Sequence, residues 1–215
     1  MRLKKFEMNL KGNDYVIGDV HGAWHLVENE MEANNFDQEV DRLFSVGDLV
    51  DRGPHSEEAV RWMDKPWFHA VRGNHEQMAI DTFNGNFPSH VYMHNGGAWF
   101  LSMQKAEQQY YVDAFESLPW AIEVETQWAN VGIVHAEVPD DDWAKVEDAY
   151  QDRGEPSMLW GRGKIFSKNT DRVENIDHVY VGHTPLKTVT VLGNVFYIDT
   201  GAVYPDGHLT IMKIN

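Results

Sequence analysis

The chain has 215 residues, enough for one domain with a substantial core over residues 1–215, and its 42% hydrophobic content excludes a disordered protein. The formal net charge of -16 argues against a nucleic-acid-binding protein, which needs a cationic face. Because the sequence contains no cysteine, disulfide bonds, thiolate metal sites and a cysteine nucleophile are excluded.

The sequence offers no segment that predicts a contact with a membrane. No stretch approaches the roughly 18 consecutive apolar residues that a membrane helix needs. The basic first residues lack the apolar stretch of a signal peptide. We therefore expect a cytoplasmic protein with no membrane partner.

Strands and helices alternate in the first part of the chain. Short apolar runs predict strands at residues 14–18, 42–46 and 67–71. Helical spacing or helix-start signals follow at residues 24–34, 56–62 and 76–83, with Ser56 as the expected N-cap of the second helix. This β-α-β-α-β order predicts parallel strands joined by right-handed crossovers.

The later part of the chain has a different character. A loop is expected at residues 84–97, a helix at 98–117, a helix at 140–150 and mostly loop and turn at 152–170. Strands are expected at residues 121–126, 128–134, 178–181, 189–192, 195–198 and 208–214, the first two forming an antiparallel pair. These strands predict a second sheet.

Polar segments stand where the predicted strands end. The early segments read Gly-Asp-Val-His-Gly at residues 18–22, Gly-Asp-Leu-Val-Asp-Arg-Gly at 47–53 and Gly-Asn-His-Glu at 73–76. His135 and His183 end later strands. Since ligands of open α/β sheets bind beyond the carboxyl ends of the strands, we expect these side chains to meet at one edge.

Six of these side chains can act as metal ligands: Asp19, His21, Asp48, Asn74, His135 and His183. Their mixture of hard oxygens and imidazoles favours manganese, iron or zinc over calcium. A carboxylate at Asp48 can bridge two cations. A solvent molecule held between two cations about 3.5–4 Å apart ionises near neutral pH and can attack a phosphate ester.

The remaining polar residues of these segments have the chemistry to complete such a site. His75 is the expected general acid for the leaving alkoxide, and Asp51 is the carboxylate that keeps it protonated and oriented. Arg52 and Arg162 are expected to hold the phosphoryl oxygens through forked hydrogen bonds.

Each of these signals has a simpler interpretation when taken alone. Gly-Asp pairs are common turn chemistry, and residues 199–201 (Asp-Thr-Gly) are either a turn or support for the site. Arg72 and seven histidines have no such context and are interpreted as structural or surface residues: His25, His55, His69, His90, His94, His178 and His208. The joint occurrence of a full ligand set at strand ends favours the functional interpretation.

Together these segments resemble the signature of the serine/threonine phosphoprotein phosphatases in the calcineurin-like metallophosphoesterase superfamily. The resemblance runs from about Tyr15 to the C-terminus. Residues 45–53, 67–78, 95–100 and 197–203 are similar to the small bacterial and bacteriophage lambda-type protein phosphatases. Those enzymes accept phosphotyrosine and phosphohistidine as well as phosphoserine and phosphothreonine.

The resemblance implies an α/β protein, a four-layer α/β/β/α sandwich of two mixed sheets, with two divalent metal ions, often manganese. It implies that one ion is held by Asp19, His21 and Asp48, and the other by Asp48, Asn74, His135 and His183. It supports His75 and Asp51 as the proton-donor pair, and it implies phosphate contacts from Arg52, Arg162 and Asn74.

Two departures limit what the resemblance carries over. Residues 135–137 read His-Ala-Glu where eukaryotic members have His-Gly-Gly. The eukaryotic C-terminal active-site loop with its tyrosine has no evident counterpart, so no regulatory subunit is implied. The expected partner is therefore a phosphoprotein or phosphopeptide substrate.

Two other functions remain open at this point. Symmetrical dinucleoside polyphosphate hydrolases of the same superfamily tend to carry Asp after Gly-Asn-His and to lack the acid before Arg-Gly, whereas this chain has Glu76 and Asp51. An inactive phosphoprotein-binding relative would have lost a metal ligand or the acid pair, and the sequence retains them all.

Overall fold

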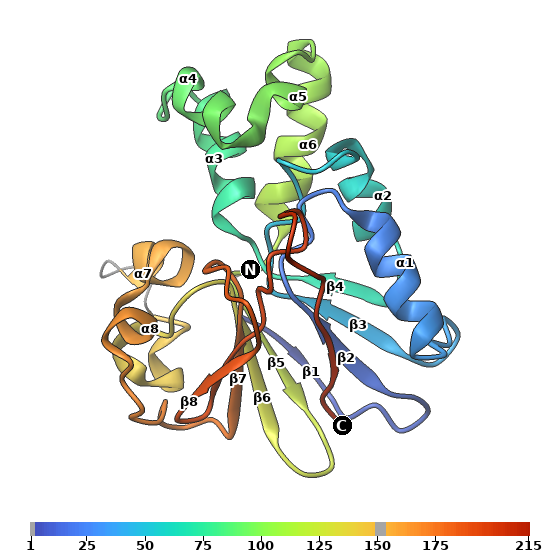
Figure 1. Ribbon diagram of the computed structural model, residues 1–215, viewed down its shortest axis with the longest axis vertical. Helices are drawn as coiled ribbons and strands as arrows, with labels where there is room; N and C mark the ends of the chain where they lie inside the picture. Colours follow the sequence, from blue (N-terminus) through green and yellow to red (C-terminus); the bar gives the residue numbers. More distant parts are fainter. Residues whose placement is uncertain (1–2, 149–153) are drawn as a thin grey trace.

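Two β-sheets pack face to face, and helices cover their outer faces (Figure 1). The computed structural model describes residues 3–148 and 154–215. Helices α1 and α2 lie on one side of the pair of sheets, and α7 and α8 lie on the other. This is the four-layer α/β/β/α sandwich that the resemblance implied.

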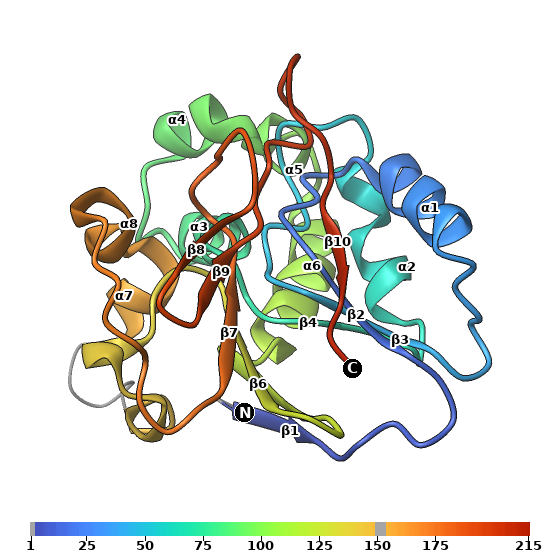
Figure 2. The same cartoon turned by 60° about the horizontal axis from the view of Figure 1, so that its bottom comes forward.

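The smaller sheet has the order β10 (Ile211–Lys213), β2 (Asp14–Ile17), β3 (Arg42–Ser45) and β4 (Phe68–Ala70). Strands β2, β3 and β4 are parallel, which confirms the predicted β-α-β-α-β run. Strand β10 runs antiparallel to β2, so the sheet is mixed. Figure 2 shows β10 beside β2, far from it in sequence.

The larger sheet has the order β1 (Leu3–Phe6), β5 (Ala121–Glu125), β6 (Asn130–Val134), β7 (His178–Val181), β9 (Val195–Tyr197) and β8 (Thr190–Leu192). Strands β5 and β6 form the predicted antiparallel pair. Strand β1 was not predicted, and it pairs in parallel with β5 at the edge of the sheet.

The helices that cover the smaller sheet are α1 (Trp24–Ala33), α2 (Ala59–Met63), α3 (Asn74–Phe83) and α6 (Lys105–Ser117). Their apolar faces meet the sheet in one core cluster, in which the Trp24 and Trp62 rings stack with centroids 4.8 Å apart. A second cluster lies between the larger sheet and the helices α7 (Gly154–Trp160) and α8 (Gly163–Ser167).

A third apolar cluster lies between the two sheets. Val16 and Phe44 from the smaller sheet and Ile122 and Ile133 from the larger one are fully buried in it. Strand β2 is buried along its whole length, because one face meets the helices and the other meets the second sheet. Apolar residues on both faces are what a strand in this position requires.

Three predictions for residues 56–117 were wrong. Ser56 lies inside the 3₁₀-helix η1 (Ser56–Glu58), where its hydroxyl accepts the N–H of Asp51 at 2.8 Å and caps no helix. The expected loop at 84–97 contains α4 (Ser89–Tyr92) and a π-helical turn, η2 (Met93–Gly97). The expected helix at 98–117 is divided at residues 102–104 into α5 (Ala98–Leu101) and α6.

Two predictions for residues 140–170 were also wrong. The expected helix at 140–150 is replaced by the 3₁₀ turns η3 (Pro139–Asp141) and η4 (Trp143–Lys145), and its last residues lie outside the described residues. Asp140 and Asp141 have φ values of 52° and 53°, which a helix cannot accommodate. The expected loop at 152–170 contains α7 and α8 instead.

The described helices are all too short or too polar to span a bilayer.

His69 in β4 provides a test of how burial affects stability. Its ring lies 4.5 Å from the Phe6 ring and 5.3 Å from the Phe44 ring. Burial, with Lys4 and Arg42 acting in the same direction, lowers the pKa of His69 to about 4. In the unfolded chain the pKa of histidine is about 6.5, so the unfolded state binds the proton more readily. Stability should therefore fall as pH drops from about 6.5 toward 4.

We expect His69→Phe to reduce the loss of Tm between pH 7 and pH 5, since the phenyl ring has no proton to bind. Thermal unfolding followed by circular dichroism at both pH values measures this loss. His178→Phe is the matched variant, because the His178 ring also packs on a phenylalanine, 5.4 Å from Phe196. Equal losses of Tm in the wild type and in His69→Phe would contradict the prediction.

Candidate active site

The loops that follow strands of both sheets meet above one edge of the sandwich, and the six predicted metal ligands come together there. The smaller sheet contributes Asp19, His21, Asp48 and Asn74, and the larger sheet contributes His135 and His183. Each of the six is no more than 6% exposed. Two carboxylates, one amide and three histidines buried at one place are costly unless they have partners, so the cluster requires a ligand or a network of hydrogen bonds.

Two histidines that follow strands of the larger sheet contact the amide oxygen of Asn74. Its Oδ1 lies 2.8 Å from Nε2 of His135 and 2.8 Å from Nδ1 of His183. Oδ1 of Asp48 lies 3.4 Å from Nε2 of His135. Asp48, His135 and His183 each offer a ligand atom, and these atoms all lie within 4.8 Å of one another.

The second oxygen of Asp48 faces a different pair of imidazoles. Its Oδ2 lies 3.8 Å from Nε2 of His21 and 3.9 Å from Nε2 of His75. His21, Asp48 and His75 form the second group whose ligand atoms lie within 4.8 Å of one another. Asp48 therefore stands between two groups of donors, as a bridging carboxylate would.

Asp19 follows a strand of the smaller sheet and contacts the loop that follows β7 of the larger sheet. Its carboxylate accepts the backbone N–H of His183 at 3.1 and 3.2 Å, and the neighbouring charge of Asp199 acts on it. A Cβ atom on Gly182 would collide with the Asp19 carboxylate, so only glycine allows this close approach. The contact between Asp19 and His183 ties the loops of the two sheets together.

Three of the predicted ligands have left-handed backbones. His21, Asp48 and His183 have φ values of 49°, 52° and 67°. For residues other than glycine this conformation costs on the order of 1–3 kcal/mol each, and it is retained mainly where surrounding structure imposes it. Strain that is concentrated on three neighbouring polar residues indicates a functional site.

Hydrogen bonds fix which nitrogen of two histidines faces the cluster. Nδ1 of His21 lies 2.9 Å from the carbonyl oxygen of Val50, and Nδ1 of His135 lies 2.8 Å from that of Val46. Because a carbonyl can only accept, each Nδ1 carries the hydrogen and each Nε2 presents its lone pair toward Asp48. This is the arrangement that metal-binding histidines require.

Burial keeps these imidazoles neutral. It lowers the pKa of His21 to about 3 and the pKa of His135 below its ordinary value. Burial and the neighbouring His135 lower the pKa of His183 to about 3. A neutral imidazole is a metal ligand, whereas a protonated one is not.

The carboxylates, in contrast, destabilise one another. Burial, Asp199 and Asp48 raise the pKa of Asp19 well above its usual range, and burial raises the pKa of Asp199 to about 6. Burial would also raise the pKa of Asp48, but His135, His75 and His21 outweigh it and lower that pKa. Divalent cations fit such a site for two reasons. Their charge neutralises the crowded carboxylates, and the lone pairs of the neutral imidazoles can bind them.

His75 and Asp51 form a closely hydrogen-bonded pair. Nδ1 of His75 lies 2.7 Å from Oδ2 of Asp51, and both side chains are fully buried. Burial would lower the pKa of His75, but Asp48 and Asp51 outweigh it, so the pKa is raised. Nε2 of His75 has no hydrogen-bond partner within the described residues. The pair therefore presents an N–H group beside Asp48 that remains free to donate.

Two exposed arginines border the cluster. Nη1 of Arg52 lies 2.6 Å from Nε2 of His21, so its guanidinium reaches in among the predicted ligands. Arg162 is exposed at the start of α8, and its Nη2 donates to the carbonyl oxygen of His183 at 3.4 Å. Each cation therefore contacts one of the predicted ligands, Arg52 through the His21 ring and Arg162 through the His183 backbone.

Several residues of this region were not predicted as part of it. Glu76 is fully buried and accepts the N–H groups of Gly73, Leu49 and Asp48, which holds the loop after β3 against α3. The capping-box position of Glu76 at the start of α3 was the available signal. The carboxylate of Asp199 accepts the N–H of Gly201 at 2.9 Å, as a turn residue would, and its charge also raises the pKa of Asp19.

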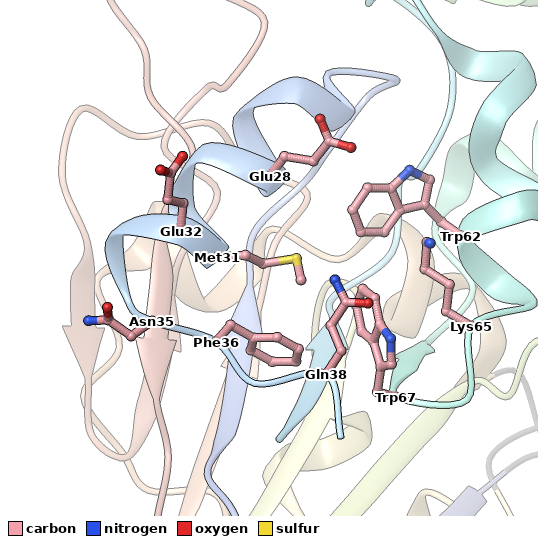
Figure 3. Close-up of a pocket in the computed structure, with 9 residues that line it drawn as sticks. All are labelled: Glu28, Met31, Glu32, Asn35, Phe36, Gln38, Trp62, Lys65 and Trp67. Atoms are coloured by element: carbon pink, nitrogen blue, oxygen red, sulfur yellow. The ribbon is translucent and has the colours of Figure 1, made fainter. Parts of the chain in front are cut away.

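A pocket of about 420 Å³ lies elsewhere, between α1 and α2 (Figure 3). Met31, Phe36, Trp62 and Trp67 form its apolar wall, and the Lys65 ammonium group lies 5.2 Å from the Trp62 ring and 5.4 Å from the Trp67 ring. None of the predicted site residues lines this pocket. The chemistry of the buried cluster is therefore separate from it.

Comparison with known proteins gives consistent results. The sequence signature described as calcineurin-like phosphoesterase matches residues 15–208. The chain is 37% identical over 206 residues to serine/threonine-protein phosphatase 1 of Salmonella typhimurium, covering 93% of this chain and 91% of that protein. It is 35% identical over 107 residues to a symmetrical bis(5'-nucleosyl)-tetraphosphatase of Coxiella burnetii, but this match covers only 48% of this chain and 36% of the relative.

Solved structures show the same fold. A protein serine/threonine phosphatase from Saccharomyces cerevisiae, with similarity to a human phosphatase, superposes with a TM-score of 0.65 at 17% sequence identity. The superposition covers 99% of this chain and 83% of the yeast chain. At this identity the likeness concerns the arrangement of the two sheets and their helices.

Proposed function

This chain belongs to the calcineurin-like phosphoesterase family of hydrolases, and we propose that it removes phosphate from phosphoserine and phosphothreonine in proteins. The observation that carries the proposal is the placement of His21, His135 and His183 around the carboxylate of Asp48, beside the His75–Asp51 pair. Similarity to a bacterial serine/threonine-protein phosphatase along nearly the whole chain supports the substrate class.

The family uses divalent metal ions, and the buried cluster of histidine and aspartate residues fits them. We propose manganese as the working metal. When bound, a pair of such ions supplies an activated water molecule and positive charge for the phosphoryl oxygens. We assign one ion to Asp19, His21 and Asp48, and the other to Asp48, Asn74, His135 and His183.

His75 supplies the proton that the leaving group needs. The alkoxide of serine or threonine is a poor leaving group, and proton donation by a positioned side chain typically contributes 10²–10⁴-fold to the rate. Nε2 of His75 is the donating atom, because Nδ1 is engaged by Asp51. Asp51 orients the imidazole and stabilises its protonated form.

Arg52, Arg162 and Asn74 orient the phosphate in this proposal. Guanidinium groups bind phosphoryl oxygens through paired hydrogen bonds, and their charge offsets the acidic surface of a protein with a net charge of -16. Since Arg52 donates to His21 at 2.6 Å, its guanidinium must turn away from His21 to reach a substrate. Arg162, at the start of α8, donates a longer hydrogen bond to the carbonyl oxygen of His183, at 3.4 Å.

We propose that the chain acts as one domain. Each sheet takes an edge strand from the other half of the sequence, β1 in the larger sheet and β10 in the smaller one. Neither half has a complete sheet of its own. The proposed ligand set also draws on both halves.

The alternative is hydrolysis of symmetrical dinucleoside polyphosphates. Similarity to an enzyme named for that reaction covers less than half of this chain, whereas similarity to the phosphatase covers 93%. Glu76 and Asp51 also stand where such hydrolases tend to have other residues. These observations favour the protein phosphatase.

Removal and return of metal tests the proposal. We expect chelation to abolish hydrolysis of a phosphoserine peptide and added Mn²⁺ to restore it. Rates on phosphoserine, phosphotyrosine and phosphohistidine peptides and on diadenosine tetraphosphate, measured under the same conditions, establish the substrate class. A rate unchanged by chelation would contradict the metal assignment, and preference for diadenosine tetraphosphate would favour the alternative.

A further inference from the structure

The carboxylate of Asp51 has two side-chain partners that the proposed function does not use. Its Oδ2 accepts Nδ1–H of His75 at 2.7 Å. Its Oδ1 accepts the indole Nε1–H of Trp99 at 2.6 Å and the hydroxyl of Tyr92 at 3.1 Å. The two oxygens are thus divided between the predicted proton donor and two aromatic side chains.

An unusual backbone delivers these two aromatic donors. Tyr92 is the last residue of α4 and Trp99 is the second residue of α5, and the π-helical turn η2 connects them. π-Helical turns are rare and often occur at functional sites. Gly97 in this turn has no side chain, and a Cβ atom there would lie 2.5 Å from the Tyr92 ring. The glycine therefore leaves room for Tyr92 to reach Asp51.

The same turn also rests on the backbone of Asp51 and Arg52. Gly96 has a φ of 106°, and a Cβ atom on it would lie 3.0 Å from Cβ of Asp51 and would collide with the backbone nitrogen of Arg52. Asp51 and Arg52 both have left-handed backbones, with φ values of 72° and 68°. Such strained residues persist where surrounding structure imposes the conformation, and the turn supplies that structure.

We propose that Trp99 and Tyr92 are positioning residues for proton donation. By holding Oδ1 of Asp51, they keep Oδ2 on Nδ1 of His75, so that Nε2–H of His75 points to the leaving group. The proton passes from Nε2 to the oxygen of the breaking P–O bond, and that oxygen leaves as an alcohol. This inference rests on the proposed function, because it requires His75 to be the proton donor.

Removal of the indole N–H should misalign the acid without removing it. In Trp99→Phe the buried Oδ1 keeps, among the described residues, only the Tyr92 hydroxyl as a donor, and the loss of a partner destabilises a buried charged group in its present orientation. Removing such an orienting partner typically costs about 10–100-fold in activity at a comparable site. Tyr92→Phe removes the longer hydrogen bond and should act in the same direction with a smaller effect.

The test compares two substrates that differ in their need for an acid. The alcohol of a phosphoserine peptide needs protonation to leave, whereas p-nitrophenolate leaves without it. With saturating Mn²⁺, we expect Trp99→Phe to lower kcat for the phosphoserine peptide about 10–100-fold and kcat for p-nitrophenyl phosphate much less, with KM unchanged. A purely structural loss would lower both rates equally.

Tyr111→Phe is the matched control. The Tyr111 ring packs on the Trp99 ring with centroids 5.1 Å apart, but its hydroxyl donates to the carbonyl oxygen of Glu57. The Tyr111→Phe substitution therefore alters a residue that packs on Trp99 but removes no hydrogen-bond donor to Asp51. We expect its ratio of the two rates to equal that of the wild type.

A spectroscopic measurement gives a readout that does not depend on turnover. The Nδ1–H signal of His75 in ¹⁵N-labelled protein, recorded with and without diamagnetic Zn²⁺, reports its hydrogen bond to Asp51. It should shift or broaden in Trp99→Phe and Tyr92→Phe and stay unchanged in Tyr111→Phe.

The outcomes separate this inference from the proposed function. If the wild type hydrolyses both substrates but Trp99→Phe and Tyr92→Phe lower both rates equally, or neither rate, the positioning role is wrong and the proposed function stands. If the wild type hydrolyses neither substrate with Mn²⁺, the proposed function is wrong and the inference fails with it. Selective loss on the phosphoserine peptide supports both.

Discussion

His75→Asn should lower kcat for a phosphoserine peptide by on the order of 10²–10⁴-fold, the usual contribution of a positioned acid. Asparagine cannot deliver a proton to the leaving alkoxide, although it keeps a polar side chain beside Asp51. The two metals should remain bound, because the proposed ligand set does not include His75. Steady-state kinetics with Mn²⁺ and elemental analysis of the purified variant measure the two effects.

Metal content is the decisive measurement for this variant. Nε2 of His75 lies 3.9 Å from Oδ2 of Asp48, close enough for His75 to act as a ligand where we assign Asp19. Loss of metal from His75→Asn would therefore show that His75 has been given the wrong role. His90→Asn makes the same substitution at an exposed position in α4 and should leave both kcat and metal content unchanged.

Asp48→Asn should remove metal binding and with it nearly all activity. The two oxygens of Asp48 face different groups of donors, so one substitution weakens both proposed ion sites. Metal ions contribute several kcal/mol of transition-state stabilisation, and each 1.4 kcal/mol is a factor of ten, so kcat/KM should fall by about 10³-fold or more. Equilibrium dialysis with Mn²⁺ and phosphatase assays measure the change.

Thermal unfolding gives a second readout of metal binding to this variant. The amide oxygen of Asn can still accept the backbone N–H of His75, as Oδ1 of Asp48 does at 3.0 Å, so we expect the variant to fold. A ligand that binds only the folded state raises Tm, so Mn²⁺ should raise Tm in the wild type but not in Asp48→Asn.

A matched control separates a general effect of lost charge from the effect at this site. Asp113→Asn removes a carboxylate from the exposed face of α6. It should leave Mn²⁺ binding and kcat/KM unchanged. Full activity and a normal metal content in Asp48→Asn would overturn the assignment of Asp48 as the shared ligand.

The meeting of the predicted site residues was foreseeable from strand order. Asp19, Asp48 and Asn74 follow three neighbouring parallel strands, and parallel strands present their carboxyl ends at one edge of a sheet. His135 and His183 follow the parallel strands β6 and β7 of the second sheet. Their place beside Asn74 depends on how the two sheets pack, which the resemblance supplied and the periodicity of the sequence did not.

The contacts of Asp51 could not be predicted in this way. Residues 84–97 are rich in glycine and asparagine and include Pro88, which favours a loop, yet they contain α4 and the π-helical turn η2. Tertiary contacts override local propensity there, because Gly96 and Gly97 are used for close packing against Arg52 and Tyr92. The hydrogen bond from Trp99 spans 48 residues and has no local sequence signal.

The short helices around Arg162 were missed for a related reason. Helix α8 has five residues, too few to be stable on their own. The carboxylate of Glu137 accepts the backbone N–H of Lys164 at 2.6 Å, and the Lys164 ammonium group contacts Asp141 at 2.9 Å. Partners more than 20 residues away therefore stabilise this helix, and no window of local sequence contains them.

The exchange of edge strands between the sheets restricts how a substrate reaches the cluster. Strand β1 is hydrogen-bonded into the sheet of the later half, and β10 into the sheet of the earlier half. The two halves of the sequence therefore cannot move apart as rigid lobes without breaking the backbone hydrogen bonds of both β1 and β10. A substrate must instead reach the cluster past the surface loops and the exposed side chains of Arg52 and Arg162, without a rearrangement of the sheets.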